Sequence, residues 1–74
     1  MTYGVVLFHT TSSAMRAEKL LIKEGCAIKL IPTPRELSSD CGIAVRFCWS
    51  ECQRIKSVLE AAGVEVDTVR QIQS

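Results

Sequence analysis

The chain carries almost no excess charge. Nine lysines and arginines stand against eight aspartates and glutamates, which gives a formal net charge of +1. These charges are dispersed, with no basic block, so electrostatic capture of nucleic acid or of an anionic membrane is not expected. Aromatic residues make up only 5% of the chain, and they show no stacking pattern of the kind that binds single strands. We therefore expect no nucleic-acid partner.

Long apolar runs are also missing. No segment is apolar for long enough to span a bilayer, and the first residues lack the basic and apolar regions of a signal peptide. The sequence therefore predicts one cytoplasmic domain over residues 1–74, without membrane contact. A chain of this length buries only about 62% of its extended surface. Because this leaves little stability to spare, self-association as a homodimer is a reasonable expectation.

Metal-binding and disulfide signals are weak. Histidine occurs once, and no Cys-x-x-Cys pair is present among the four cysteines, Cys26, Cys41, Cys48 and Cys52. In a reducing compartment these thiols are expected to stay reduced. Their spacing matches no standard zinc framework. We expect neither a metal nor a cofactor.

The apolar residues that are present follow two periods. Continuous or alternating runs predict four strands, over residues 3–8, 27–31, 42–48 and 64–69. Apolar residues at helical spacing predict a helix over residues 14–24 and a second one that begins with a capping box at residues 50–53 and ends at Gly63. Another capping box predicts one helical turn after residue 33. Residues 71–74 are expected to be a frayed tail.

The predicted order β-α-β-β-α-β is the split βαβ plan. The fold class is therefore α+β and ferredoxin-like, with a four-stranded antiparallel sheet and two helices on one face. Right-handed crossovers place the third strand between the first and the second. Strand direction then brings His9, the start of the first helix and the connection over residues 32–41 to one end of the fold. The other three cysteines are expected near the opposite end.

Cys41 is the strongest candidate for chemistry. A structural cysteine normally lies inside an apolar stretch, whereas Cys41 follows a small polar turn and precedes Gly42, where backbone is easily approached. We interpret it as a thiol that is used in a reaction. The alternative is that Cys41 is only a small residue at the start of a strand.

Polar residues near Cys41 in the predicted fold complete the candidate site. Arg35, His9 and the N-terminus of the first helix would lower the pKa of the thiol, whereas Asp40 would raise it. The Thr10 hydroxyl could help to bind an anion, although ordinary helix capping explains it equally well. The candidate binding residues are Ser38, Ser39, Asp40, Gly42, Arg35, His9 and Thr10.

The remaining cysteines are interpreted as packing residues. Cys52 shares the buried stripe of the second helix, Cys48 ends a strand, and Cys26 follows the glycine that ends the first helix. Arg46 lies within an apolar strand and therefore needs a carboxylate partner or a path to solvent. A place on the open sheet face or in a dimer interface suits it at least as well as contact with a substrate.

The sequence contains no evident nucleophile, base and orienting group that would form a catalytic set. A reactive thiol without such machinery favours a carrier over an enzyme. The carrier would hold sulfur or selenium as a persulfide or selenosulfide on Cys41, and pass it between partner enzymes. For this role, the thiol must reach two different active sites, and a glycine-flanked loop tip suits that task.

Three stretches resemble a known family. Residues 3–8, 31–39 and 41–47 are similar to the selenium/sulphur-carrier-like family of short prokaryotic domains, and the resemblance covers nearly the whole chain. Residues 32–39 followed by Cys41 and Gly42 are its most specific part. The resemblance implies a role in sulfur or selenium trafficking with Cys41 as the carrier thiol.

A cysteine desulfurase would be a typical donor for the carrier.

Two other classes of function stay open beside the carrier. A regulatory or ligand-binding module without catalysis would use the open sheet face, since small split-βαβ domains often pair through their sheets. A thiol redox sensor would instead be oxidised selectively at Cys41 by mild peroxide.

Overall fold

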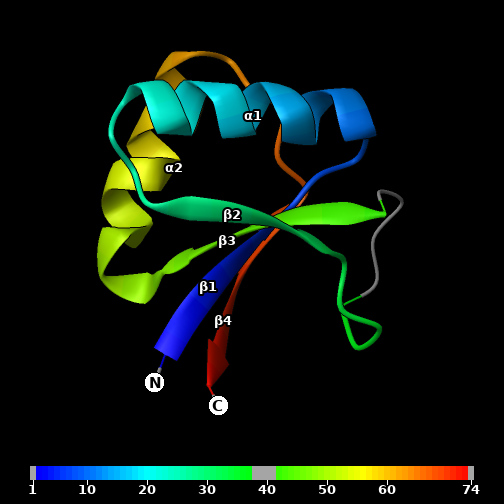
Figure 1. Ribbon diagram of the computed structural model, residues 1–74. Coiled ribbons are helices and arrows are strands. Elements are labelled where there is room, and N and C mark those ends of the chain that lie inside the picture. Colours follow the sequence, from blue (N-terminus) through cyan, green and yellow to red (C-terminus); the bar gives the residue numbers. More distant parts are fainter. Residues whose placement is uncertain (1, 38–41, 74) are drawn as a thin grey trace.

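The computed structural model describes residues 2–37 and 42–73. Within these ranges the chain follows the predicted β-α-β-β-α-β order and has the α+β, ferredoxin-like arrangement (Figure 1). A short 3-10 helix, η1 (Trp49–Glu51), precedes the second α-helix. The other elements are β1 (Thr2–Leu7), α1 (Thr11–Lys23), β2 (Ile28–Pro32), β3 (Ile43–Cys48), α2 (Cys52–Ala61) and β4 (Thr68–Gln73).

The four strands form one antiparallel sheet in the order β2-β3-β1-β4. As predicted, β3 lies between β1 and β2. Ile43, at the start of β3, pairs with Pro32 of β2, whereas Cys48, at the end of β3, pairs with Tyr3 of β1. The register therefore decides which residues meet at each end of the sheet.

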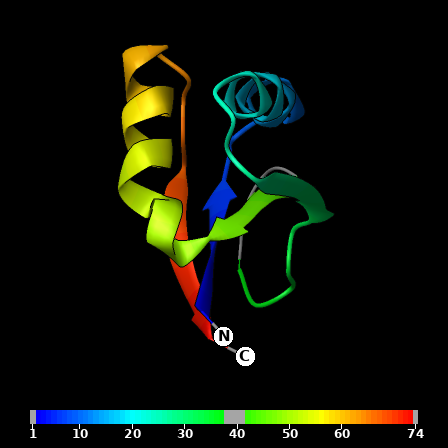
Figure 2. The ribbon, with the colours of Figure 1, turned by 60° about the vertical axis from the view of Figure 1, so that its left-hand side comes forward.

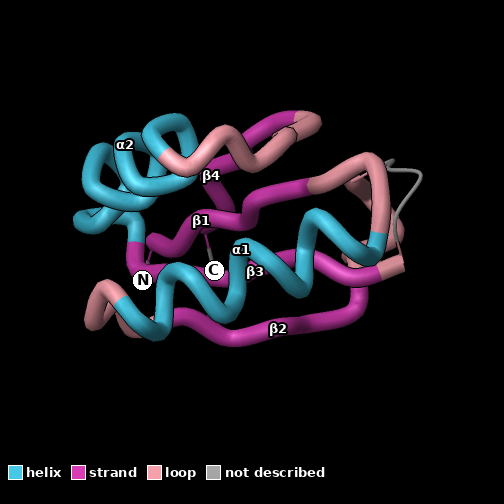
Figure 3. The backbone as a smooth tube through the Cα atoms, turned by 90° about the horizontal axis from the view of Figure 1, so that it is seen from above, coloured by secondary structure: helices cyan, strands magenta, loops and turns pink. Residues whose placement is uncertain are grey.

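The main core lies between the sheet and the two helices. Val6 and Phe8 of the first strand segment and Val45 and Phe47 of β3 point to this side, as the two-residue period of a strand requires. Both helices cover this face, and from above α1 runs across β2 and β3 with α2 beside it (Figure 3). The buried helix residues are Ala14, Ala17 and Leu21 of α1 and Cys52, Ile55 and Leu59 of α2.

The starts of the two helices differ from the prediction. Helix α1 begins at Thr11 because the Thr10 hydroxyl accepts a hydrogen bond from the Ser13 N–H at 3.1 Å. The capping box predicted at residues 50–53 is wrong, since Glu51 is the N-cap of α2 and makes no side-chain cap hydrogen bond. The 3-10 turn leads into α2 instead, and the Ser50 hydroxyl lies against the Cys48 thiol.

The last strand begins later than predicted. Val64 is buried and Val66 packs against the helix-side core, yet both precede β4. The Asp67 N–H donates a hydrogen bond of 2.8 Å to the Leu7 carbonyl, and β4 then pairs with β1 through Gln73. The predicted frayed tail is therefore wrong for residues 71–73, because β1 offers partners along its whole length.

The face away from the helices carries a second, smaller core. Val5, Leu7 and Ala44 form a buried cluster there with Leu37, which is only 4% exposed. Leu37 comes from the connection between β2 and β3, which drops away from the sheet on the side opposite the helices (Figure 2). The helical turn predicted after residue 33 is a single turn closed by the Leu37 N–H and the Pro34 carbonyl at 3.0 Å. This face is therefore only partly open to a ligand or a partner.

Gly4 permits the close approach of Phe47, its register partner. A Cβ added at Gly4 would overlap the Phe47 ring. We expect Gly4→Ala to lower the free energy of unfolding by about 1–3 kcal/mol through overpacking. Thermal unfolding followed by circular dichroism would show this as a lower midpoint. In Gly42→Ala the new Cβ meets nothing within 4 Å, so equal losses in both variants would contradict the explanation.

Candidate functional site

The predicted candidate site lies at one end of the sheet. Leu7 pairs with Ala44, and Pro32 pairs with Ile43, so the end of β1, the end of β2 and the start of β3 lie together. Tyr3 pairs with Cys48 at the other end. The prediction that the connection before β3 and the end of the first strand share one end is therefore confirmed.

Four of the predicted site residues, Ser38, Ser39, Asp40 and Cys41, lie outside the described residues. What the structure defines is the two points between which they are held. Leu37 is buried in the second core. On the other side, the Gly42 carbonyl accepts a hydrogen bond from the Thr33 N–H at 3.0 Å. Leu37 and Gly42, the described residues on either side of this gap, are thus both attached to the rest of the fold.

Gly42 is exposed, and its backbone does not adopt a positive φ angle. A Cβ added at this position would meet no atom within 4 Å among the described residues, apart from its neighbours in the chain. The structure therefore gives no packing or conformational reason for a glycine here. Open space beside the backbone is consistent with the predicted access of a partner to this end of the sheet.

The other predicted binding residues are at the surface. His9, Thr10 and Arg35 are all exposed. The Thr10 hydroxyl caps α1, which is the helix-capping role that the sequence offered as the alternative to anion binding. It lies 3.1 Å from the Ser13 hydroxyl. Within the described ranges, none of the three is hydrogen-bonded to another. They share one end of the fold without forming a buried, preorganised site.

The packing role predicted for the other cysteines is confirmed for two of the three. Cys26 is 5% exposed and Cys52 is 7% exposed, and both belong to the helix-side core. The prediction is wrong for Cys48, which is exposed. The strand alternation explains this, because Cys48 shares the face of Arg46 and not that of Phe47.

Cys48 also has an unusual environment for a surface thiol. Its Sγ lies 3.2 Å from the Ser50 Oγ. Hydrogen bonds from the side chain and then the backbone of Ser50 lower the pKa of the Cys48 thiol. Desolvation, and after it the nearby charge of Glu51, oppose this shift only in part. A thiol with a lowered pKa is more often in its reactive thiolate form. The sequence did not reveal this contact, because a serine such as Ser50, just before a predicted helix, is typical of an N-cap.

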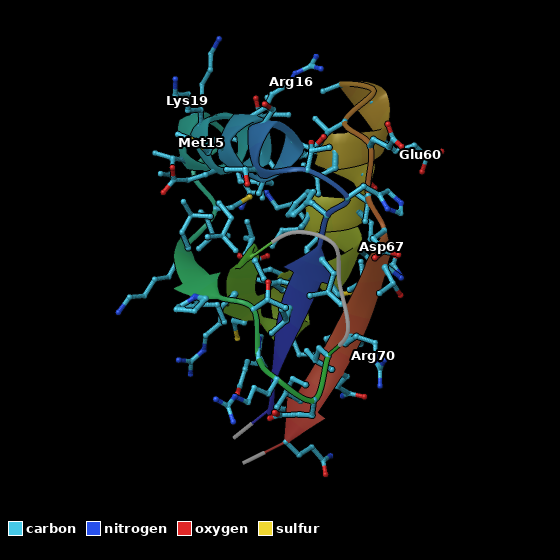
Figure 4. The ribbon with its side chains drawn as sticks, turned by 90° about the vertical axis from the view of Figure 1, so that its right-hand side faces the viewer. Met15, Arg16, Lys19, Glu60, Asp67 and Arg70 are labelled. Carbon is cyan, nitrogen blue, oxygen red and sulfur yellow. The ribbon has the colours of Figure 1, made fainter. Side chains whose placement is uncertain are left out.

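Arg46 reaches solvent on the face away from the helices. This is one of the two alternatives that the sequence left open for Arg46, the other being a carboxylate partner. Its guanidinium carbon also lies 4.2 Å from the centroid of the Tyr3 ring, which is a cation–π contact. The register places Lys29, Arg46, Val5 and Arg70 in one row across the sheet. Three of these four are exposed cations, and Figure 4 shows Arg70 on β4.

Metal binding and membrane insertion both require features that can be checked in the described part of the chain. No group of three or more histidine, cysteine, aspartate or glutamate residues there is arranged to hold a metal ion. None of the helices in residues 2–37 and 42–73 has the length and apolar character that crossing a membrane requires.

The comparison with known proteins gives one match. The model of the family described as "Putative Se/S carrier protein-like" matches residues 3–71. No curated protein and no solved structure matches the chain. The family match includes both ends of the connection between β2 and β3.

The attachment of residues 38–41 depends on Leu37. We expect Leu37→Ala to lower the free energy of unfolding by about 2–4 kcal/mol, because it removes a buried side chain from the second core. Denaturant unfolding measures this loss. Ile22→Ala is the matched control, since Ile22 is 58% exposed. A loss no larger than that of the control would mean that Leu37 does not anchor the connection.

The reactivity of Cys48 depends on Ser50. In Ser50→Ala the side-chain hydrogen bond that lowers the pKa of Cys48 is lost, so the pH midpoint for alkylation of Cys48 should move upward. At neutral pH, Cys48 should then react more slowly with iodoacetamide, as followed by peptide mass spectrometry. Ser57→Ala, at an exposed position of α2, should leave the midpoint in place. The same midpoint in all three proteins would refute the role of Ser50.

Proposed function

Because the chain belongs to the Se/S carrier-like family, we propose that it holds a sulfur or selenium atom on Cys41 and passes it from a donor protein to an acceptor. The family description supports the class of cargo. The assignment to one thiol depends on the exposure of the other cysteines. The donor and the acceptor follow from the chemistry that a carrier requires.

The burial of Cys26 and Cys52 is the observation that supports Cys41 best. A carrier thiol must enter the active site of another protein, and a sulfur inside a core cannot do so without unfolding its surroundings. Cys26 and Cys52 are 5% and 7% exposed. This leaves Cys41 and Cys48, and only Cys41 belongs to the stretch that most specifically resembles the family.

The attachment of the connection supports the same choice. Leu37 is buried on one side of residues 38–41, and on the other side Gly42 is hydrogen-bonded to Thr33. Fixing both ends of a short segment lowers the entropy that is lost when a partner binds it. The connection between β2 and β3 therefore gives a partner a defined place to dock.

The transfer itself is a thiol exchange. The Cys41 thiolate would attack the outer sulfur of a persulfide on the donor, such as a cysteine desulfurase. A bond forms between the two sulfurs, the sulfur–sulfur bond of the donor breaks, and the donor cysteine leaves as a thiolate with the electron pair. A second exchange then delivers the sulfur to the acceptor. Selenium would follow the same steps as a selenosulfide.

A loading experiment tests the proposal. The protein is incubated with a cysteine desulfurase and cysteine, and its intact mass is measured without reductant. We expect the mass of one added sulfur in the unsubstituted protein and in Cys48→Ser, and none in Cys41→Ser. Peptide mapping then identifies the loaded cysteine.

Cys48→Ser is the matched control, because Cys48 is the exposed thiol among the described cysteines. If the added sulfur persists in Cys41→Ser and disappears in Cys48→Ser, the carrier thiol has been assigned to the wrong end of the sheet. If neither variant nor the unsubstituted protein takes up sulfur, the carrier function itself fails.

A further inference from the structure

A hollow of about 330 Å³ lies at the end of the sheet opposite the connection over residues 33–42. It forms where β1 and β2 begin and β3 ends, and its lining includes Tyr3, Lys29, Arg46 and Cys48. Five residue steps of about 3.3 Å separate the two ends of β3, a distance of about 17 Å. The volume is near the lower end of the range for sites that bind small molecules.

The lining is positively charged. Lys29 and Arg46 are register partners on neighbouring strands, and both are exposed. The contact of Arg46 with the Tyr3 ring holds the guanidinium beside the hollow. Among the described residues that line the hollow, none is acidic. An anion that enters it would therefore meet two cations without a competing carboxylate.

The thiol of Cys48 shares this lining. Cys48 is exposed, and its Sγ lies beside the Ser50 hydroxyl. The negative charge of Glu51 raises the pKa of this thiol. The carboxylate of Glu51 lies 3.8 Å from the Arg54 guanidinium. The nearest described acid is thus partly neutralised by its own partner, and the surroundings of Cys48 stay basic.

We propose that this hollow is a modification site, which binds small disulfides that carry carboxylates and lets Cys48 take up one half of them as a mixed disulfide. Glutathione disulfide is an example of this chemical class. Lys29 and Arg46 would pair with the carboxylates. The apolar residues of the lining, Ala27, Ile28 and Phe47, would contact the rest of the molecule. This site is separate from the carrier thiol and does not depend on it.

The reaction needs no further reagent. The Cys48 thiolate attacks one sulfur of the bound disulfide, and a bond forms between that sulfur and Sγ. The sulfur–sulfur bond of the small molecule breaks at the same time. Its other half leaves with the electron pair as a thiolate and takes a proton from water. Cys48 is oxidised, and one half of the disulfide is reduced.

The test compares an anionic with a neutral reagent in full-length Cys41→Ser protein, so that the carrier thiol does not contribute. Dithiobis-nitrobenzoate is a disulfide with two carboxylates, whereas dithiodipyridine is a neutral one. The measured quantity is the ratio of their two rate constants at Cys48. Peptide mass spectrometry shows which cysteine has reacted, and intact mass shows uptake of one half of glutathione disulfide.

We expect Lys29→Gln/Arg46→Gln to lower this ratio roughly tenfold, about threefold for each charge several ångströms from the reagent in water. Lys19→Gln/Lys56→Gln removes the same charge from the helices, where Figure 4 shows Lys19 on α1, and should leave the ratio unchanged. An equal fall in both double variants would overturn the proposal, because it would reduce the effect to net charge.

The salt dependence of the two rate constants tests the same charge effect without a substitution at Lys29 or Arg46. Added salt should slow dithiobis-nitrobenzoate at Cys48 and leave dithiodipyridine unaffected, since screening weakens only the charged encounter. The proposal fails if the two reagents respond equally to salt, or if glutathione disulfide leaves Cys48 unmodified. None of these outcomes bears on sulfur loading of Cys41.

Discussion

The antiparallel pairing of β3 with β1 on one side and β2 on the other is the constraint on which the rest of the structure depends. A slip of one residue would turn Val45 and Phe47 out of the core, because neighbouring strand residues point to opposite faces. The same register places Ile43 at the end where the connection from β2 returns, and Cys48 at the other end. The position of Cys48 and the end of the sheet at which β3 begins therefore follow from the packing of apolar residues on the helix side.

The face away from the helices has two parts with different chemistry. Near the end of β1 it is covered by Leu37, which buries Leu7 and Ala44. Burial on a second face matters in a short chain, because a small domain gains little from one core alone. The connection that leads to Cys41 thus contributes to folding as well as to the candidate site. Toward the start of β1 the cover ends, and Lys29 and Arg46 are exposed.

The sequence was sufficient for the order of elements and the sheet topology. A continuous apolar run predicts β1, and an alternating run predicts β3. Gly25 and Gly63, both with positive φ angles, end the helices where expected. It was not sufficient for the start of β4. Val64 and Val66 alternate with polar residues as in a strand, but they pack against the core, and pairing with β1 begins only at Thr68. It was also misleading at Ser50, whose hydroxyl contacts a thiol rather than capping a helix. A contact between the side chains of Ser50 and Cys48 depends on how the backbone turns after β3, and the local sequence does not determine that turn.

The two ends of β3 suit different kinds of partner. Cys48 lies at the end of a paired strand, in a hollow of about 330 Å³. A small molecule that enters the hollow can reach this exposed thiol. The connection between β2 and β3 differs, since its described residues Leu37 and Gly42 are attached to the fold by packing and by a hydrogen bond outside the strand pairing. A sulfur that must visit two proteins needs the second arrangement, whereas a sulfur that reacts with small anions needs the first. The carrier proposal thus depends on the connection before β3, and the proposal for small thiol-reactive molecules depends on the hollow beside Cys48 at the other end of the strand.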